Sequence, residues 1–376
     1  MKVILVDDDP LALKLLESEL TAIGQVEIIG SYQDPRLVIQ DMRAGLPDAV
    51  FLDIHMPFIS GLELAEQILG ESPDIQIVFV TAYQEHAVEA FELTAQDYII
   101  KPFQRERLIK TCARVRRMLT LYSARRSDAA LPVMIHCFKS FLIEGRVPGA
   151  AAVRWKTFKA QELFLYLLQH QGITVQKQHL LEHLWAEIDW KRAITQLYTT
   201  IYQIRMLIVK ENLTIRIVNQ DEGYRLELGG VEVDVLVWEK QLEQAPMLTE
   251  ATLELHLKLF AMYRGDYLME HEFLWAEPEK RRLRAIWQYH RHQLLDFYKT
   301  KGRYSEAIAF LLQVQKVNLT EEQVYFELMQ LYQETGDRFS LEQQFALLQG
   351  MLSREYDASP KTEVREWYMN WKQTME

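Results

Sequence analysis

The 376-residue sequence predicts a multidomain protein that joins an α/β doubly wound domain, a small domain of helices and a hairpin, and an all-α domain of paired helices. Three observations lead to this fold class. Apolar runs alternate with amphipathic stretches over residues 1–118, three helical patterns and a hairpin occupy 132–231, and a 34-residue repeat marks 232–376. We expect a linker at 119–131, where the apolar period is lost.

The first domain contains five short apolar runs that predict strands. They lie at 3–6, 26–30, 49–52, 75–80 and 98–100, and segments of helical period such as 11–20 and 62–69 separate them. Because the runs are continuously apolar, the strands should be buried on both faces. A five-stranded parallel sheet covered by helices on both sides satisfies that pattern.

The middle domain begins with β-like character at 133–153. Helical patterns follow at about 159–169, 176–185 and 190–209. Two β-branched runs, 213–218 and 224–228, then bracket the sequence NQDEG, which predicts a hairpin closed by Gly223.

The last domain repeats itself at the period of tetratricopeptide helix pairs. Three pairs of like residues are each 34 positions apart: Leu294 and Leu328, Tyr298 and Tyr332, and Gly302 and Gly336. Two such units alone would be marginally stable, so we expect the helical patterns at 235–263 and 360–372 to flank them.

The net charge of -11 is unevenly distributed along the chain. Lys and Arg number 11 against 19 Asp and Glu in residues 1–120, 14 against 10 in 121–231, and 17 against 24 in 232–376. The local field at a docking surface decides phosphate binding, so the basic middle segment indicates a polyanionic partner despite the acidic whole.

Cysteine content and hydropathy indicate the compartment. Cys112 and Cys137 are the only cysteines, which is too few for a disulfide scaffold and suits a reducing environment. The opening MKVILVDDDP does not resemble a signal peptide, and no uncharged apolar stretch is long enough to span a bilayer. We therefore expect a cytosolic protein without a membrane partner.

Polar residues follow four of the predicted strands. Asp7 and Asp8 come after the first, Asp53 after the third, Thr81 after the fourth and Lys101 after the fifth, so all five should meet at one edge of the sheet. Clustered carboxylates repel one another unless a hard cation, most plausibly Mg²⁺, lies between them. Asp53 is then the candidate nucleophile for an acyl phosphate, with Lys101 and Thr81 within reach of the phosphoryl group.

The segments VDDDP, FLDIHMPFISGLE, VTAYQEHAVEAFE and DYIIKPF resemble the receiver domain of bacterial two-component response regulators. The resemblance implies that a sensor histidine kinase phosphorylates Asp53, that Tyr98 is an aromatic switch, and that a cis peptide before Pro102 directs Lys101 into the pocket. It also implies the Mg²⁺ ligands: the carboxylates of Asp7, Asp8 and Asp53 and the backbone carbonyl of His55.

The middle domain is similar to the OmpR-type winged helix-turn-helix, which carries a recognition helix and a wing. In that arrangement the helix at 190–209 lies in the major groove and the hairpin reaches the backbone or the minor groove. We expect its solvent face to include Gln203 along with the candidate contacts. The candidate DNA contacts are Lys191, Arg192, Thr195, Gln196, Thr199 and Arg205 on the helix, and Arg216 and Arg225 on the wing.

The last domain resembles the bacterial transcriptional activator domain, on the segments RGDYL, FLWAE, RRLR, GRYSEA, VYFELMQLYQETGD and SREYDASP. Together with the winged helix it is similar to the SARP family of regulators. Helical repeats are interaction surfaces, and no catalytic cluster is visible among these residues, so we do not expect an enzyme.

These features predict a DNA-binding response regulator that forms a homodimer and activates transcription when Asp53 is phosphorylated. The partners expected are a histidine kinase and double-stranded DNA, with RNA polymerase as a further candidate. The alternative is a receiver-controlled scaffold that binds proteins through its helical repeats, without specific DNA binding. A third hypothesis, an aspartyl-phosphate hydrolase, lacks a separate general acid.

Overall fold

The computed structural model describes residues 1–42, 45–72, 75–82, 97–125, 133–144, 153–220, 222–317 and 320–374. These residues form two compact units. One unit contains Met1–Met134 and Ile143–Glu232, and the other contains Ile135–Leu142 and Val233–Glu376. None of the helices in these ranges combines the length and the apolar character that a bilayer crossing requires.

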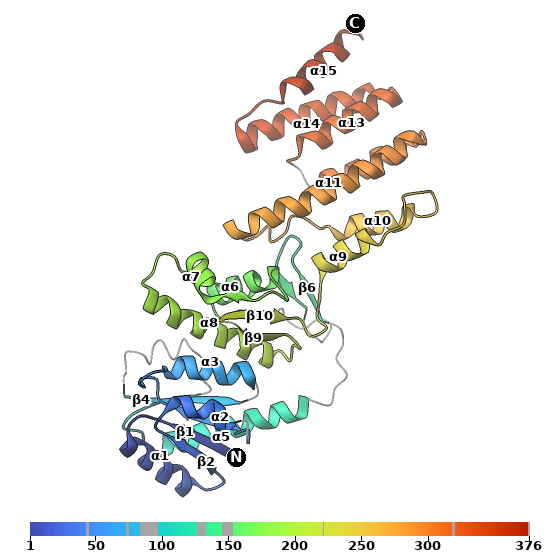
Figure 1. Cartoon of the computed structure of the whole chain (residues 1–376). Helices are drawn as coiled ribbons and strands as arrows, with labels where there is room; N and C mark the ends of the chain where they lie inside the picture. The colour runs from blue at the N-terminus through green and yellow to red at the C-terminus, as the bar shows by residue number, and fades with distance from the viewer. Residues whose placement is uncertain are drawn as a thin grey trace. The chain divides into compact units, whose positions relative to one another are not determined.

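The N-terminal part of the first unit is built on a five-stranded parallel sheet, as predicted (Figure 1). Its strands run in the order β2-β1-β3-β4-β5. Their bounds are β1 (Lys2–Val6), β2 (Glu27–Tyr32), β3 (Ala49–Leu52), β4 (Gln76–Thr81) and β5 (Asp97–Ile100).

Helices cover both faces of this sheet. The bounds are α1 (Pro10–Ile23), η1 (Pro35–Leu37), α2 (Val38–Met42), α3 (Gly61–Glu71) and α5 (Arg105–Arg125). Alternate strand residues face opposite layers: Val3 and Leu5 pack with α1 and α5, whereas Ile4 and Val6 pack with α2 and α3. The result is the three-layer doubly wound arrangement that continuous apolar strands predict.

Helix α5 is longer than the sequence interpretation allowed. It continues to Arg125, so residues 119–125 of the expected linker are helical. The physical reason is that no Gly or Pro occurs between 103 and 131, and the segment is rich in helix-forming Arg, Leu, Met and Ala.

The second part of the first unit has the helix, helix, helix and hairpin order of a winged helix-turn-helix. Its elements are α6 (Phe158–Gln169), β8 (Val175–Gln176), α7 (Lys177–Leu184), α8 (Trp190–Lys210), β9 (Arg216–Gln220) and β10 (Gly223–Glu227). The strands form an antiparallel sheet in the order β8-β10-β9. Thr157 caps α6 and Asp189 caps α8, each accepting backbone N–H bonds that the first turn leaves open.

The hairpin lies where it was predicted. Gly223 pairs with Gln220 as the last pair before the turn, and Glu222 within the turn takes the left-handed conformation with a φ of 57°. A glycine is still needed at 223, because a Cβ there would lie 2.4 Å from the backbone oxygen of Val175 on the neighbouring strand.

The second unit is almost entirely helical, as the repeat predicted (Figure 1). Its helices are α9 (Asp234–Glu243), α10 (Leu253–Met262), α11 (Glu277–Thr300), α12 (Tyr304–Val317), α13 (Glu322–Thr335), α14 (Arg338–Tyr356) and α15 (Thr362–Gln373), with a short η2 (Leu274–Ala276). Gly302 and Gly336 both have left-handed φ values, 67° and 72°, so the two repeat turns share one backbone conformation.

A third small sheet contains β6 (Met134–His136), β7 (Leu142–Ile143) and β11 (Glu232–Val233) in the order β11-β6-β7. Aromatic side chains pack against one another in the second unit. The ring of Trp287 stacks on Phe260 and Tyr263 with centroid separations of 5.1 and 4.8 Å.

Candidate functional site

Three carboxylates converge at the carboxyl edge of the parallel sheet. Asp7 and Asp8 follow β1 and Asp53 follows β3, and each offers an oxygen within 4.8 Å of the other two. Asp7 and Asp53 are buried, with 2% and 7% of their surfaces exposed, whereas Asp8 is exposed. Buried carboxylates this close repel one another, and an oxygen-preferring divalent cation is the group that best relieves that repulsion.

Lys101 reaches the same pocket from the end of β5. Its Nζ lies 2.5 Å from Asp7 Oδ2 and 3.8 Å from Asp53 Oδ1, and the Lys101–Pro102 peptide is cis, as expected. Burial raises the pKa of Asp53 to about 6; Lys101 opposes the rise, and Asp7 adds to it. Asp53 is therefore a carboxylate near neutral pH, and it is more basic than an exposed aspartate.

Two buried oxygens in this pocket make no hydrogen bond to the described part of the chain. They are Asp53 Oδ1 and the hydroxyl Oγ1 of Thr81, a residue that is 0% exposed at the end of β4. A buried hydroxyl that lacks a partner costs free energy unless a ligand satisfies it. The donor set of carboxylates, one hydroxyl and one ammonium suits a Mg²⁺ ion with a phosphoryl group beside it.

Three further residues are Asp9, which follows Asp8 in the sequence, and the predicted residues His55 and Tyr98. The carboxylate of Asp9 accepts the backbone N–H of Leu11 and so caps the N-terminus of α1. His55 is exposed on the loop after Asp53. The backbone of Tyr98 pairs with Phe79 in the sheet, but its side chain lies outside the described residues.

Most of the predicted DNA contacts on α8 are accessible. Lys191, Arg192 and Gln196 are exposed, and Thr195 and Thr199 are partly exposed. Each of these two threonine hydroxyls donates to the carbonyl four residues earlier, at 3.0 and 2.7 Å, so their oxygens remain acceptors.

The wing positions are also partly accessible. Arg216 is exposed on β9. Arg225 on β10 is partly exposed and makes an ion pair of 2.7 Å with Glu227. An ion pair at the surface exchanges readily for a phosphate contact because it contributes little stability.

Arg205 and Gln203 do not lie on a solvent face, contrary to expectation. They are 5% and 7% exposed. Arg205 donates to the backbone oxygens of Ile217 and Glu66, and Gln203 accepts a bond from Thr157 Oγ1. Glu66 lies 139 residues earlier in the chain, so no local pattern could have revealed this contact.

Comparison with known families identifies the two ends of the chain. Residues 3–113 match the family model of the response regulator receiver domain. Residues 234–370 match the model of the bacterial transcriptional activator domain.

Curated relatives share the N-terminal part. Protein MrkE of Klebsiella pneumoniae is 46% identical over 109 residues, which are 29% of this chain and 40% of that protein. The transcriptional regulatory protein YpdB of Escherichia coli K12 is 44% identical over 108 residues, 29% of this chain and 44% of that protein. The chain thus spans less than half the length of these relatives. A crystal structure of the response regulatory domain of MrkE covers 33% of this chain and 99% of its own, with 40% identity and a TM-score of 0.29.

Fold, pocket and family matches together identify a response regulator receiver domain in the N-terminal part of the chain. The chain joins a receiver domain to a bacterial transcriptional activator domain of the SARP type. Its carboxylates of Asp7, Asp8 and Asp53 lie close enough together to hold a metal ion.

Proposed function

We propose that this chain is a DNA-binding transcription regulator whose activity is set by phosphorylation of Asp53, with a sensor histidine kinase as donor. One observation supports the site above all others. The buried Asp53 Oδ1, without a hydrogen bond in the described part of the chain, lies 3.8 Å from Lys101 Nζ in the pocket that also holds Asp7 and Asp8.

The pocket residues have separable tasks in this proposal. Asp7, Asp8 and Asp53, with the backbone carbonyl of His55, would hold Mg²⁺, which supplies charge neutralisation around the phosphoryl group. Asp53 attacks phosphorus as the carboxylate, and the bond from phosphorus to the donor breaks as the acyl phosphate forms. Lys101 then pairs with the phosphoryl oxygens, and the Thr81 hydroxyl donates a hydrogen bond to them.

The switch we propose follows from those last two contacts. Thr81 is drawn toward the phosphoryl group and Tyr98 buries its ring, which changes the surface made by residues 83–96, β5 and α5 and favours a homodimer. Residues 83–96 lie outside the described part of the chain. Shifting a population from 1:99 to 99:1 takes about 5.5 kcal/mol, within reach of a phosphoryl, lysine and metal cluster.

The proposed output is binding of duplex DNA by the winged helix. Lys191, Arg192, Thr195, Gln196 and Thr199 would contact the major groove, and Arg216 and Arg225 on the wing would contact the backbone or the minor groove. The helical C-terminal unit would contact RNA polymerase or another protein and so activate transcription. A cytosolic location fits Cys112 and Cys137, which are both free and buried.

Labelling with a small phosphodonor tests the pocket. Wild type and Asp9→Ala, the matched control for a neighbouring carboxylate, should take up phosphate from labelled acetyl phosphate in the presence of Mg²⁺. Asp53→Ala should not. Equal labelling of Asp53→Ala would show that another residue accepts the phosphoryl group.

Salt dependence tests the output. With roughly 3 to 4 phosphates neutralised per subunit, the logarithm of the duplex binding constant should fall against the logarithm of salt concentration with a slope of about -3 to -4. Arg216→Ala should reduce the slope by about 1. Full-length protein that shows no salt-sensitive duplex binding, with and without phosphodonor, would favour the protein scaffold instead.

A further inference from the structure

Glu66 on α3 of the receiver is buried by the winged helix. Its surface is 2% exposed, and its carboxylate is surrounded by polar groups from three winged-helix elements. Asn219 Nδ2 donates to Oε2 at 3.2 Å, Lys177 Nζ lies 3.5 Å from Oε2, and Arg205 Nη1 lies 3.7 Å from Oε1. A single receiver carboxylate thus neutralises two cations of the DNA-binding domain.

Arg205 donates hydrogen bonds to the receiver and to its own winged helix at the same time. Its Nη1 donates to the backbone oxygen of Glu66 at 3.1 Å, while Nε and Nη2 donate to the backbone oxygen of Ile217 at 3.3 and 2.9 Å. Burial lowers the pKa of Arg205, and the charge of Glu66 opposes that shift. A buried guanidinium is tolerated only while such a counter-charge remains in place.

Apolar contacts along α8 extend this contact between the receiver and the winged helix. Tyr202 is 6% exposed and belongs to the same apolar cluster as Leu64, Ile68 and Phe79 of the receiver, and Met206 packs against that cluster. At 100° per residue, Tyr202 and Met206 lie opposite Leu197, Ile204 and Ile208, the stripe that α8 buries within its own domain. Therefore α3 covers the outward face of the second half of α8.

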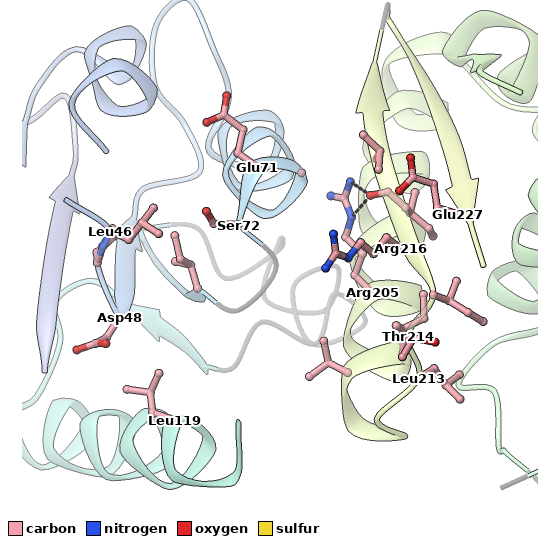
Figure 2. A pocket seen from close by; sticks show the side chains of 18 residues that line it. Leu46, Asp48, Glu71, Ser72, Leu119, Arg205, Leu213, Thr214, Arg216 and Glu227 are labelled. Carbon is pink, nitrogen blue, oxygen red and sulfur yellow. Dashed lines mark hydrogen bonds between the residues drawn. The ribbon is translucent and has the colours of Figure 1, made fainter. Parts of the chain in front are cut away.

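Two cavities border the contact between α3 and the winged helix. One cavity, of about 640 Å³, lies between receiver residues such as Leu46, Glu71 and Leu119 and winged-helix residues that include Arg205 and Arg216 (Figure 2). A second, of about 860 Å³, is lined by Glu63 and Gln67 of α3 and by residues of the winged helix. A contact region bordered by two cavities of this size resembles a transient interface that can separate, and not a continuous core.

The predicted DNA contacts Thr195 and Thr199 lie on the same face of α8 as Tyr202, which α3 covers. An α-helix with its side chains is about 10–12 Å wide and fills a major groove of about 12 Å, so a recognition helix cannot keep a second helix on its outward face while it lies in the groove. We propose that this arrangement is a closed state in which α3 competes with duplex DNA for α8, and that Glu66 holds it closed. The inference rests on the DNA-binding function proposed above.

The same helix begins at the phosphoacceptor loop. The backbone N–H of Gly61, at the start of α3, donates to the backbone oxygen of Ile54 at 2.8 Å, one residue after Asp53. Glu66 follows roughly 7.5 Å further along the helix axis. If phosphorylation moves the loop after Asp53, helix α3, which carries Glu66, therefore moves with it.

The test uses full-length wild type, Glu66→Gln and Glu66→Lys, with Glu17→Gln on the exposed face of α1 as the charge-matched control. Affinity is measured by fluorescence anisotropy with a labelled random-sequence duplex at low salt. Without phosphodonor, Glu66→Gln should bind at least ~10-fold more tightly than wild type, and Glu66→Lys more tightly still, because the buried cations lose their counter-charge. Glu17→Gln should match wild type.

Two further readouts separate the possible failures. Amide hydrogen exchange over residues 198–209 should be faster in Glu66→Gln, and phosphodonor labelling of Asp53 should remain at the wild-type level, which shows an intact receiver. If phosphodonor tightens duplex binding by wild type while both Glu66 variants bind as wild type does without it, the closed state is wrong and the proposed function stands. If no sample binds duplex under any condition, the DNA-binding function fails and this inference fails with it.

Discussion

Gly61 lies directly against Asp53: a Cβ on Gly61 would be 1.9 Å from the backbone oxygen of Asp53 and 2.8 Å from its carbonyl carbon. Both neighbouring atoms belong to the main chain, so a side chain at this position can be accommodated only if the phosphoacceptor loop or α3 moves. The glycine is thus required by close approach, although it is the first residue of a helix.

Gly61→Ala should therefore impair both stability and phosphorylation. We expect a loss of about 1–3 kcal/mol in the free energy of unfolding, as for other forced overpacking, and at least ~10-fold slower labelling of Asp53 by acetyl phosphate. Gly45→Ala is the matched control, because a Cβ at Gly45 meets nothing within 4 Å. Wild-type labelling by Gly61→Ala would mean that the loop adapts without disturbing the carboxylate.

The sequence predicted the parallel sheet and its pocket for a simple reason. Strands buried on both faces are continuously apolar, and parallel strands bring the residues after their carboxyl ends to one edge, so Asp7, Asp53 and Lys101 could be placed together before any coordinates. The repeat likewise predicted the paired C-terminal helices. Gly302 and Gly336 are one repeat apart, and both take a left-handed φ in the turn between two helices.

The burial of Arg205 could not be predicted in this way. Helical period shows that Arg205 is not part of the stripe that α8 buries in its own domain, but it does not show which other surface covers the remaining face. That surface is supplied by Glu66, from a helix of period and composition typical of any receiver helix. Contacts between domains depend on two surfaces at once, and local pattern describes only one of them.

The two repeat leucines should be equally important to the C-terminal unit. Leu294 and Leu328 occupy equivalent positions and are both 0% exposed. Truncation of either to Ala should lower the free energy of unfolding by about 2–5 kcal/mol, because each leaves a cavity. Leu274→Ala, at a leucine that is 88% exposed, should change it by less than about 0.5 kcal/mol. Urea denaturation of the three variants measures the differences; a small effect at only one of the paired positions would show that the repeats pack differently.

Arg291 and Glu327 form a buried ion pair. Replacing both residues should lower the free energy of unfolding by less than the sum of the two single replacements. Arg291 is 1% exposed, and its Nη2 lies 3.5 Å from Glu327 Oε1, while Nη1 bonds to Glu321 at 2.7 Å. Arg291→Leu should cost about 3–5 kcal/mol, since it leaves buried carboxylate charge uncompensated. Adding Glu327→Leu should recover part of that loss, which a double-mutant cycle measures. Strictly additive losses would mean that the two side chains do not interact.

His290 should make the second unit sensitive to mild acid. His290 is 1% exposed; burial and the neighbouring His256, whose Nδ1 is 3.0 Å from His290 Nε2, lower its pKa from 6.5 to about 4. As the pH falls, His290 is therefore protonated in the unfolded chain before it is protonated in the folded unit. The stability from neutral His290 is fully present above pH 6.5 and is lost as pH falls through about 4, a total of roughly 3 kcal/mol.

Hydrogen exchange over α10 and α11 at about pH 7 and pH 5 measures this loss locally, with wild type compared against His290→Gln at each pH. The glutamine keeps a donor for His256 but does not titrate, so the stability difference between the two proteins should shift by about 2 kcal/mol in favour of the variant at about pH 5. His179→Gln, at an exposed histidine on α7, should show no such shift. A pH-independent difference between wild type and His290→Gln would mean that folding does not lower the pKa of His290.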